Sequence, residues 1–474
     1  MDTLIYNATI KSNTTNDYTA KPKKQLYQPI KTIFMDNIDY IRDLDKSGKA
    51  RPCVLDNVER MILCNTIYLG YDAFECPICH EENLIFRHCH SRFCSSCGVK
   101  YAKQLATSVL SFSVNVKHRH MVFTIPEELR SFFLRDRSLL NLLFIAARNT
   151  ISAIVNNHIF RKLKKQAKKL HRDVYNTKYL YKNFKNAIDF GMIATLHTFG
   201  RDLTFNPHIH ALIPELIYDS SKNEVREFNY FDFKKLRTTF QYELLRLMHQ
   251  TIGSSFTSTK HAIYDSKNNG FYVYAKSNPI VDEEENDDRR DYEDDINGCI
   301  SYCMRYAGRP AMAESRITDY NENTKSVSWF YNSHYDEKRH DVTHDVHSFI
   351  NKLIIHIPDH HFKMTRYYGF YANASQKKLD KIHQLWDQKI INKHTQKQRQ
   401  QLKQKLLYKC RYRTMSIDSF NRDPLKCRCG NFMVYTITYN PLEGGHNDRA
   451  YREACINEIK AMRIRRTSAT MVTT

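Results

Sequence analysis

The chain has 474 residues, and its 72 lysines and arginines outnumber its 51 aspartates and glutamates, which gives a formal net charge of +21. This length allows two or three domains, and the charge favours nucleic acid as a partner over a basic protein that binds no polyanion. The sequence shows neither a secretory signal nor an apolar run approaching a membrane span, so we expect a cytoplasmic protein whose cysteines are thiols or metal ligands.

The N-terminal part of the chain combines a tail, a helical segment and a cluster of cysteines. Residues 1–25 are polar and predict a disordered tail. From residue 26 to about 105, apolar residues at helical spacing, including Ile30, Ile33 and Phe34, lead into the cysteines. We therefore predict that residues 26–105 form a separate module.

Two Cys-x-x-Cys pairs, Cys76 with Cys79 and Cys94 with Cys97, are separated by fourteen residues. Each pair directs two thiolates toward one point, and four thiolates satisfy tetrahedral zinc. We predict that these four residues hold one structural Zn²⁺. Buried free cysteines are the alternative, but they would not need the paired spacing.

Other residues around these pairs extend the predicted module. Four of them leave open a second zinc site: Cys64, His88, Cys89 and His90. Three basic residues, Arg87, Arg92 and Lys100, favour recognition of DNA ends, whereas a purely structural zinc is the alternative.

The next segments predict strands and a basic helix. His118 to Pro126 has strand character and ends at a proline, and residues from about 136 to 188 are helical and strongly basic. Gly191 to Phe199 predicts another strand, and residues 200–206 predict its hairpin return. That return leads into Asn206-Pro-His208-Ile-His210, followed by an apolar run typical of an inner strand.

His208 and His210 lie on one face of the predicted strand, because side chains two residues apart on a strand point the same way. Both imidazoles can then bind one metal ion. Without further context, a His-x-His pair in a chain with 22 histidines is weak evidence for a metal site.

The C-terminal half contains an acidic segment and many tyrosines. Ten of the fourteen residues from Asp282 to Asp295 are acidic, which predicts a solvated loop. Tyr302 and Tyr306 follow, four residues apart and thus on one face of a helix. Because six such tyrosine pairs occur in the chain, the spacing alone does not select this one.

The remaining sequence regains apolar character at residues 349–371 and continues into a Lys- and Gln-rich helix at 376–409. The basic helices at 161–169 and 376–409 could follow DNA phosphates or could simply be solvated faces. A Cys-x-Cys pair, Cys427 and Cys429, lies near the C-terminus.

Several of these stretches, taken together and in order, resemble the rolling-circle, HUH-type transposases of insertion sequences. The resemblance rests on the cysteine module, the strand from His120 to Pro126, residues 196–203 leading into His208-Ile-His210, and residues 302–310. Residues 348–350 and 366–369 are similar less specifically. The resemblance covers residues 26–375, and the order of its parts makes it specific.

The resemblance implies a DNA transposase that acts as a metal-dependent single-strand endonuclease and strand transferase. It implies that Tyr302 and Tyr306 attack the scissile phosphate and form a 5′-phosphotyrosine. A Mg²⁺ or Mn²⁺ ion would be held by the two histidines and a third polar side chain. We choose His197, which lies on the strand predicted to pair with the His-x-His strand, while Asp202 and Glu215 stay open.

Nearby positive charge would help to form the tyrosine phenolate, and Arg305 is one source of it. We also include Arg309, which follows the tyrosines, among the residues expected to bind DNA. The sequence has no Gly-x-x-x-x-Gly-Lys-Ser/Thr loop and hence no predicted ATP-driven motor. The expected partners are therefore single-stranded element ends and a host helicase or replication machinery.

Two departures from the family pattern are visible, the acidic segment and the C-terminal Cys-x-Cys where relatives more often have Cys-x-x-Cys. The second departure puts a C-terminal zinc in doubt. One alternative function is a plasmid replication initiator or relaxase, which uses the same chemistry. The other is a non-catalytic, zinc-dependent DNA-binding protein.

We expect an α+β fold in which an antiparallel-sheet HUH nuclease domain with packed helices follows a zinc-ribbon-like domain. The predicted divisions are a tail at 1–25, the zinc-binding DNA-recognition domain at 26–105, the catalytic domain at 106–375 and a basic helical region at 376–474. The resemblance supports this arrangement as much as the residue pattern does.

Overall fold

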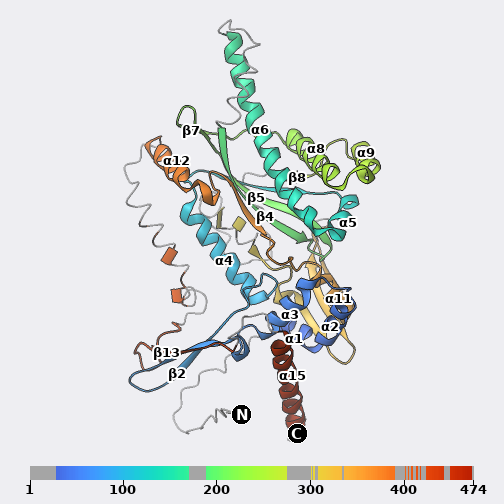
Figure 1. Cartoon of the computed structure of the whole chain (residues 1–474), viewed down its shortest axis with the longest axis vertical. Coiled ribbons are helices and arrows are strands. Elements are labelled where there is room, and N and C mark those ends of the chain that lie inside the picture. The colour runs from blue at the N-terminus through green and yellow to red at the C-terminus, as the bar shows by residue number, and fades with distance from the viewer. Residues whose placement is uncertain are drawn as a thin grey trace.

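The structure is a computed structural model that describes residues 28–169, 188–274, 300–333 except 302 and 305–307, 336–389, 423–441 and 449–471, together with isolated positions between 401 and 417. Every strand pairing among these residues is antiparallel, and helices lie against the sheets (Figure 1). This mixed arrangement confirms the predicted α+β class.

The largest sheet has seven strands in the order β7-β6-β4-β5-β3-β8, and β12 pairs with β4. Its strands are β3 (His118–Thr124), β4 (Ile188–Phe199), β5 (Phe205–Pro214), β6 (Leu216–Asp219), β7 (Glu224–Glu227), β8 (Val273–Tyr274) and β12 (Thr365–Gly369). The long strand β4 pairs with three neighbours, so β4 and β5 occupy the centre of the sheet.

One face of this sheet is covered by a group of helices. They are α5 (Glu127–Arg135), α6 (Leu140–Lys169), α8 (Phe233–Ile252) and α9 (Thr257–Ser266). Alternate residues of the central strands, such as Leu196 and Ile209, pack with Phe133 and Phe240 of these helices in one hydrophobic cluster. Figure 1 shows α6 crossing the sheet and extending beyond it.

The opposite face packs against α4 (Ser95–Phe112) and α12 (Gln376–Lys389). Ile193 of β4 and Leu212 of β5 belong to this second cluster, as do Cys303 and Met304. Because strand side chains alternate between faces, His197, His208 and His210 point toward this same side of the sheet.

The three N-terminal helices and one later helix share a third hydrophobic cluster with a small sheet. The helices are α1 (Pro29–Asp36), α2 (Ile38–Lys46), α3 (Pro52–Leu63) and α11 (Val346–Ile354), and the sheet comprises β9 (Ile317–Asn321), β10 (Ser326–Asn332) and β11 (Arg339–Asp345). Ile33 and Phe34 of α1 are fully buried and pack with Trp329 of β10. The cluster thus combines residues from both sides of position 105.

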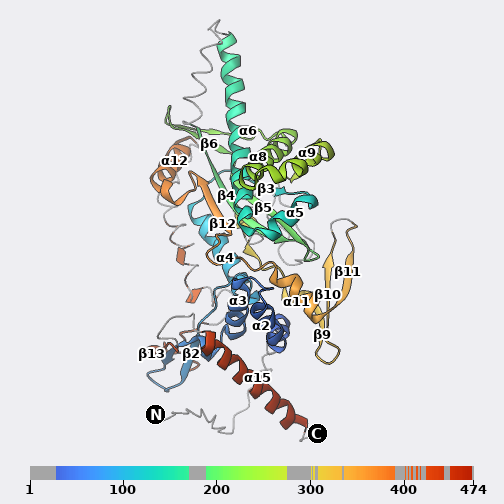
Figure 2. The same ribbon diagram turned by 45° about the vertical axis from the view of Figure 1, so that its right-hand side comes forward.

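The C-terminal segments return to the N-terminal ones. Strand β13 (Val434–Tyr439) pairs with β1 (Tyr71–Glu75), which pairs with β2 (Glu82–Phe86). Helix α15 (Arg449–Met471) packs beside α3, and both Figures 1 and 2 show it next to the N-terminal helices. The region after residue 376 therefore contributes a strand as well as helices.

Short 3-10 turns connect several elements: η1 (Ile67–Leu69), η2 (Arg137–Leu139), η4 (Ser254–Phe256), η5 (Glu314–Arg316) and η6 (Asn373–Ser375). The predicted strands at 118–126 and 191–199 and the hairpin return at 200–206 are confirmed within a few residues. Strand β5 begins earlier than expected and includes Pro207. The register of β5 with β4 shifts nearby, between His197 and Phe199, so the regular ladder is already interrupted at this end.

Some predicted segments lie outside the described residues. They are the tail at 1–25, residues 170–187 of the helix predicted for 136–188, the acidic segment at 282–295, and most of residues 390–409 of the helix predicted for 376–409. The expectation that no apolar run approaches a membrane span needs correction. The helix Arg137–Lys165 is long and apolar enough to cross a membrane. However, 56% of its most apolar window is buried inside the protein, as in a core helix.

Candidate active site and cysteine clusters

The hairpin of β4 and β5 brings three histidines together. His197 on β4 lies directly opposite His208 on β5, and His210 lies two residues further along the same strand face. One ring nitrogen from each of these three residues lies within 4.8 Å of the others. His197 and His210 are buried, whereas His208 is half-buried and faces the edge of the cluster.

The spacing of the imidazole nitrogens suits metal binding. The Nε2 atoms of His208 and His210 are 3.0 Å apart. With metal–nitrogen bonds of about 2.1 Å, this separation gives an N–metal–N angle of about 90°, as between adjacent ligands of an octahedral ion. The three residues therefore fit a divalent metal ion.

Hydrogen bonds fix how these rings are presented. His208 donates from Nδ1 to the backbone carbonyl of Asn206 at 2.7 Å, which leaves its Nε2 lone pair for a metal. His210 Nδ1 lies 2.9 Å from Nε2 of His120 on β3. A hydrogen bond donated from His210 Nδ1 to His120 puts the lone pair of His210 on Nε2, the atom that lies 3.0 Å from His208 Nε2.

The burial of these rings keeps them neutral. Desolvation, opposed by a hydrogen bond to Asn206, lowers the pKa of His208 to about 4, and desolvation also lowers the pKa of His120 to about 4. Desolvation and the neighbouring imidazoles place the pKa of His210 well below its usual value. Neutral imidazole is the form that binds metal.

The two open alternatives for a third ligand are engaged elsewhere. Asp202 accepts a hydrogen bond from the Thr204 hydroxyl at 2.8 Å within the hairpin turn. Glu215 accepts from Arg119 Nε at 2.6 Å. Among the three candidates, the structure brings only His197 into the described histidine cluster.

Tyr302, Tyr306 and Arg305 lie outside the described residues. Their neighbours Cys303 and Met304 are buried on the face of the sheet toward which the histidines point. A Cβ atom added to Gly308 would come within 2.5 Å of Ala102 on α4, so the chain after the tyrosines runs in close contact with this helix.

The cysteines form two clusters rather than the one centre predicted from Cys76, Cys79, Cys94 and Cys97. This pairing of the two Cys-x-x-Cys turns was wrong. Spacing along the sequence shows that each turn offers two sulfurs, but it does not show which other sulfurs the folded chain brings to each turn.

The first cluster comprises Cys64, Cys89, Cys94 and Cys97, all buried. Cys64 caps the end of α3 and Cys94 precedes the first turn of α4. The sulfur of Cys97 lies 3.5 Å from that of Cys64 and 3.6 Å from that of Cys89. Tetrahedral zinc with Zn–S bonds of about 2.3 Å places sulfurs about 3.8 Å apart, so these residues fit Zn²⁺.

Positive groups surround the first cluster. His88 lies 3.8 Å from the sulfur of Cys64, and hydrogen bonding to that sulfur raises the pKa of His88 to about 9. Lys31, which the sequence analysis missed, donates to the backbone carbonyl of Cys64 at 2.9 Å. Of the four residues that the sequence suggested for a second zinc site, Cys64 and Cys89 belong to this cluster, whereas His88 and His90 do not.

The second cluster comprises Cys76, Cys79, Cys427 and Cys429. The sulfur of Cys76 lies 3.5 Å from that of Cys429, and the sulfur of Cys79 lies 3.3 Å from that of Cys427. Cys79 and Cys429 are exposed, unlike every member of the first cluster. The C-terminal pair was the part of the sequence whose zinc was in doubt.

The predicted DNA-binding residues occupy different surroundings. Arg92 is half-buried and its guanidinium lies over the ring of Tyr101, 5.2 Å from the centroid. Burial lowers the pKa of half-buried Lys100, while the charges of Cys97 and Cys64 raise it. Arg87 lies 4.0 Å from Asp72, and Arg309 is half-buried. Lys100 thus faces the first cysteine cluster.

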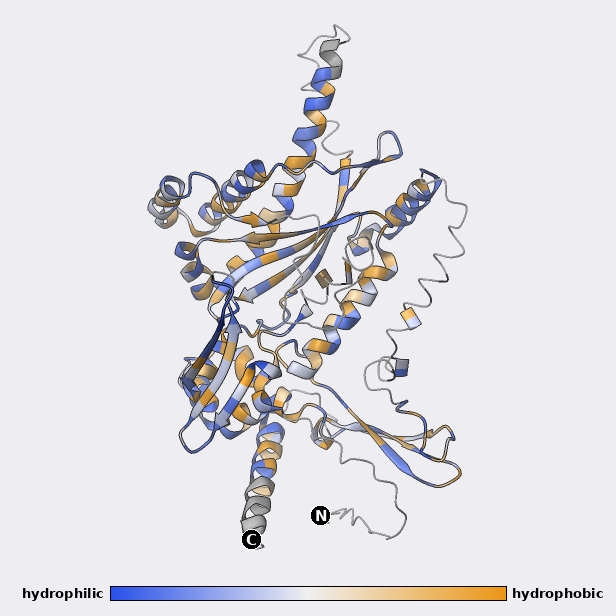
Figure 3. Cartoon of the chain, turned by 180° about the vertical axis from the view of Figure 1, so that it is seen from behind, coloured by the Kyte–Doolittle hydropathy of each residue, from blue (hydrophilic) through white to orange (hydrophobic). Residues whose placement is uncertain are grey.

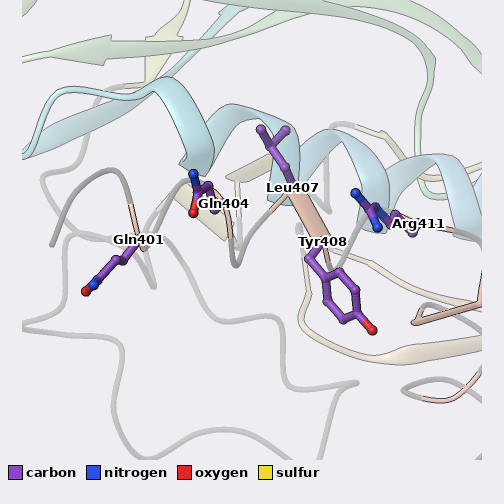
Figure 4. A pocket seen from close by; sticks show the side chains of 5 residues that line it. All are labelled: Gln401, Gln404, Leu407, Tyr408 and Arg411. Atoms are coloured by element: carbon purple, nitrogen blue, oxygen red, sulfur yellow. The ribbon is translucent and has the colours of Figure 1, made fainter. Parts of the chain in front are cut away.

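A surface pocket in the C-terminal region is lined by Gln401, Gln404, Leu407, Tyr408 and Arg411 (Figure 4). All five side chains are exposed, and none belongs to the histidine or cysteine clusters. The pocket therefore adds no group to the candidate active site.

The comparisons with known proteins agree with the two kinds of cluster. Residues 191–379 match the family described as "Putative transposase", and residues 35–125 match the "Transposase zinc-binding domain" of the IS91 type. The chain is thus similar to transposases in both regions and to the IS91 type in the second. The first match contains the histidine hairpin, and the second contains the first cysteine cluster, so the zinc-binding domain and the cysteine clusters support structural zinc.

Two relatives extend the similarity to most of the chain. It is 24% identical over 432 residues to the "Transposase for insertion sequence element IS801" of Pseudomonas savastanoi pv. phaseolicola, covering 88% of this chain and 91% of that protein. It is 21% identical over 363 residues to the "Putative transposase y4qJ" of Sinorhizobium fredii, covering 71% and 80% respectively. No solved structure matches the chain. Both family descriptions and both relatives' names are those of transposases, a class of protein that binds DNA and cleaves and transfers its strands.

Proposed function

We propose that this transposase cleaves and rejoins single DNA strands through a 5′-phosphotyrosine intermediate, in a rolling-circle type of transposition. The observation that carries the proposal is the meeting of His197, His208 and His210 on the sheet face against which Cys303 and Met304 pack. Tyr302 and Tyr306 are sequence neighbours of Cys303 and Met304, and this adjacency in the chain supports a role for the tyrosines beside the histidine cluster.

His197, His208 and His210 would hold the divalent ion, which when bound polarises the scissile phosphate and stabilises the charge that develops on it. Imidazole nitrogen suits Mn²⁺ better than Mg²⁺, because Mg²⁺ prefers oxygen ligands. We therefore expect Mn²⁺ to support higher activity than Mg²⁺. His120 positions the ring of His210 through the 2.9 Å contact between His120 Nε2 and His210 Nδ1.

The covalent step uses one of the two tyrosines as the nucleophile. The phenol loses its proton to solvent, its oxygen attacks phosphorus, and the bond from phosphorus to the 3′ oxygen breaks. The phosphate stays on the 5′ end and becomes linked to the tyrosine, while the 3′ oxygen leaves and takes a proton. Arg305, between the tyrosines in the sequence, supplies positive charge that favours the phenolate.

Strand joining reverses this step with a second 3′ hydroxyl as the nucleophile. Two tyrosines allow two DNA ends to be held in turn, as transfer of a strand from donor to target requires. Since the sequence carries no predicted ATP-driven motor, single-stranded ends would come from a host helicase or from replication. Arg305 and Arg309, together with the basic segments, are the proposed contacts to DNA phosphates.

The test is incubation of the purified protein with a labelled single strand carrying an end of its own element, in Mn²⁺ or Mg²⁺. A protein-linked DNA band on a denaturing gel is expected, and it should disappear in His208→Ala, His210→Ala and the double variant Tyr302→Phe with Tyr306→Phe. Exposed His261 on α9 and Tyr242 on α8 offer matched controls, His261→Ala and Tyr242→Phe, which should retain the band. A band that survives in all of the site variants would refute the proposal.

A further inference from the structure

The second cysteine cluster joins two segments that are far apart in the chain. Cys76 and Cys79 lie in the turn between β1 and β2, and Cys427 and Cys429 precede β13. The contact between Cys76 and Cys429 spans 353 residues of sequence. Figures 1 and 2 both show β13 and β2 in the same small sheet at the edge of the molecule, where β1 lies between them.

A backbone hydrogen bond closes each of the two cysteine turns. In the N-terminal turn, the His80 amide donates to the Cys76 carbonyl at 3.0 Å, and in the C-terminal turn the Gly430 amide donates to the Cys427 carbonyl at 3.0 Å. Gly430 has φ +90°, a left-handed conformation that glycine adopts without strain. The sulfurs of the two turns meet, because Cys76 and Cys79 each lie within 3.5 Å of a sulfur from the C-terminal turn.

The sulfur positions fit a tetrahedral ion. Separations between the two turns are 3.3, 3.5 and 3.7 Å, close to the roughly 3.8 Å expected around zinc. Four thiol sulfurs form the donor set that structural Zn²⁺ prefers, and a closed four-ligand site leaves no open position for a substrate.

Strand β13 has little else to hold it in place. All six of its residues are exposed, so hydrophobic burial contributes little to its docking. Besides the ladder to β1, its side chains donate two hydrogen bonds, from Thr438 Oγ1 to Asp72 at 2.5 Å and from Thr436 Oγ1 to the Ala73 carbonyl at 3.0 Å. Two of its tyrosine rings also lie beside rings of β1. Figure 3 shows hydrophilic as well as hydrophobic residues along this small sheet. An exposed edge strand of this kind is only marginally stable without a further constraint.

Helix α15, which follows β13, is held independently. Arg452 on α15 is buried and donates to Glu59 on α3 at 3.0 Å, and Cys455 and Ile456 pack into the cluster of the N-terminal helices. Loss of the second cysteine cluster should therefore free β13 without freeing α15.

We propose that Cys76, Cys79, Cys427 and Cys429 bind a second Zn²⁺ that clips the C-terminal strand β13 onto the β1–β2 hairpin. This clip is separate from the buried zinc site of the first cluster, and it does not depend on the proposed DNA cleavage. Zinc replaces the burial that β13 lacks, because metal binding to a folded site stabilises the contacts that assemble it.

The first test counts zinc in the purified full-length protein by elemental mass spectrometry. The wild-type chain should contain two zinc ions, and Cys429→Ser and the double variant Cys427→Ser with Cys429→Ser should contain one. Because Cys429 is exposed, the serine variant should keep the rest of its fold. The control Cys53→Ser alters a buried thiol outside both clusters and should retain two ions. One ion in the wild type, or two in the double variant, would overturn the proposal.

The second test measures amide hydrogen exchange. In Cys429→Ser, amides of β13 and of the adjoining β1 should exchange at least about tenfold faster than in the wild type, whereas amides of α15 should be unchanged. The conservative variant Cys429→His, which restores a zinc ligand, should recover the second ion and slow the exchange again. Unchanged exchange in β13 after loss of the second ion would show that the metal does not clip the strand.

Discussion

The candidate metal-binding clusters of this protein differ in how far apart their residues lie in the sequence. The histidine cluster draws on one hairpin and the first cysteine cluster on residues 64–97, and both are set within well-packed cores. The second cysteine cluster draws on two turns, residues 76–79 and residues 427–429, and has two exposed members. The two clusters whose residues are close in sequence are therefore part of the protein core. The second cysteine cluster, whose residues are far apart in sequence, holds the peripheral strand β13.

The strongest test of this comparison removes a sulfur from the buried cluster. Cys94→Ser should reduce the free energy of unfolding by more than about 4 kcal/mol, because loss of the ion leaves buried polar sulfurs within the core of the N-terminal helices. Chemical denaturation followed by circular dichroism measures this change. A loss no larger than that of Cys429→Ser would erase the distinction between the two clusters.

The next largest effect is expected where α15 docks by packing and charge without metal. Arg452→Ala leaves Glu59, which is 1% exposed, without its closest cation, and should cost about 3 kcal/mol of unfolding free energy. The same helix offers a control in Lys460, which pairs with exposed Asp39 at 2.8 Å. Lys460→Ala should change the stability by less than about 1 kcal/mol. Equal effects would show that the buried pair does not dock the helix.

A smaller effect is expected at the partner of the histidine cluster. His120→Ala removes the group that fixes the ring of His210, and should weaken Mn²⁺ binding about 10-fold to 100-fold. His120→Gln, whose amide can accept the same hydrogen bond, should recover most of the affinity. Isothermal titration calorimetry distinguishes the two variants. Equal affinity in the wild type and His120→Ala would remove the positioning role.

The smallest effect concerns a buried histidine outside every metal-binding cluster. His356 lies 3.1 Å from both the Thr198 hydroxyl and the Leu203 carbonyl, and desolvation lowers its pKa to about 3. Between pH 6.5 and 3 the unfolded chain then binds more protons than the folded one, so the stability contributed by neutral His356 is present above pH 6.5 and is lost as the pH falls.

His356→Gln should accordingly reduce the pH dependence of unfolding in this range by at most about 1.4 kcal/mol per pH unit. Denaturation series at pH 6.5, 5.5 and 4.5 measure the slope. An unchanged slope in the variant would indicate that His356 titrates normally in the folded protein.

The sequence predicted the locally built parts of the molecule well. The strands at 118–126 and 191–199 follow from period-two patterns, and the hairpin return at 200–206 follows from turn residues. Both kinds of signal act over a few positions. The choice of His197 stays a prediction, although the structure places it with His208 and His210 and engages Asp202 and Glu215 elsewhere.

The parts that the sequence did not predict depend on long-range packing. The partners of Cys76 and Cys79 lie about 350 residues away, and spacing within a motif carries no information about such contacts. His120 could have been predicted as a partner of the histidine pair, because His118 and His120 lie two residues apart and thus on one face of a strand that was predicted. Lys31 offered no such signal, because it lies on an ordinary helix far from the cysteines in sequence.

The proposed mechanism rests on a covalent bond between a tyrosine and the 5′ end of the cleaved strand. Digestion of the protein–DNA adduct with protease and nuclease, followed by tandem mass spectrometry, locates the nucleotide that remains on the protein. We expect this nucleotide to be attached through a 5′ phosphate to Tyr302 or Tyr306. Attachment to any other residue, or cleavage of the DNA without a covalent adduct, would refute the mechanism.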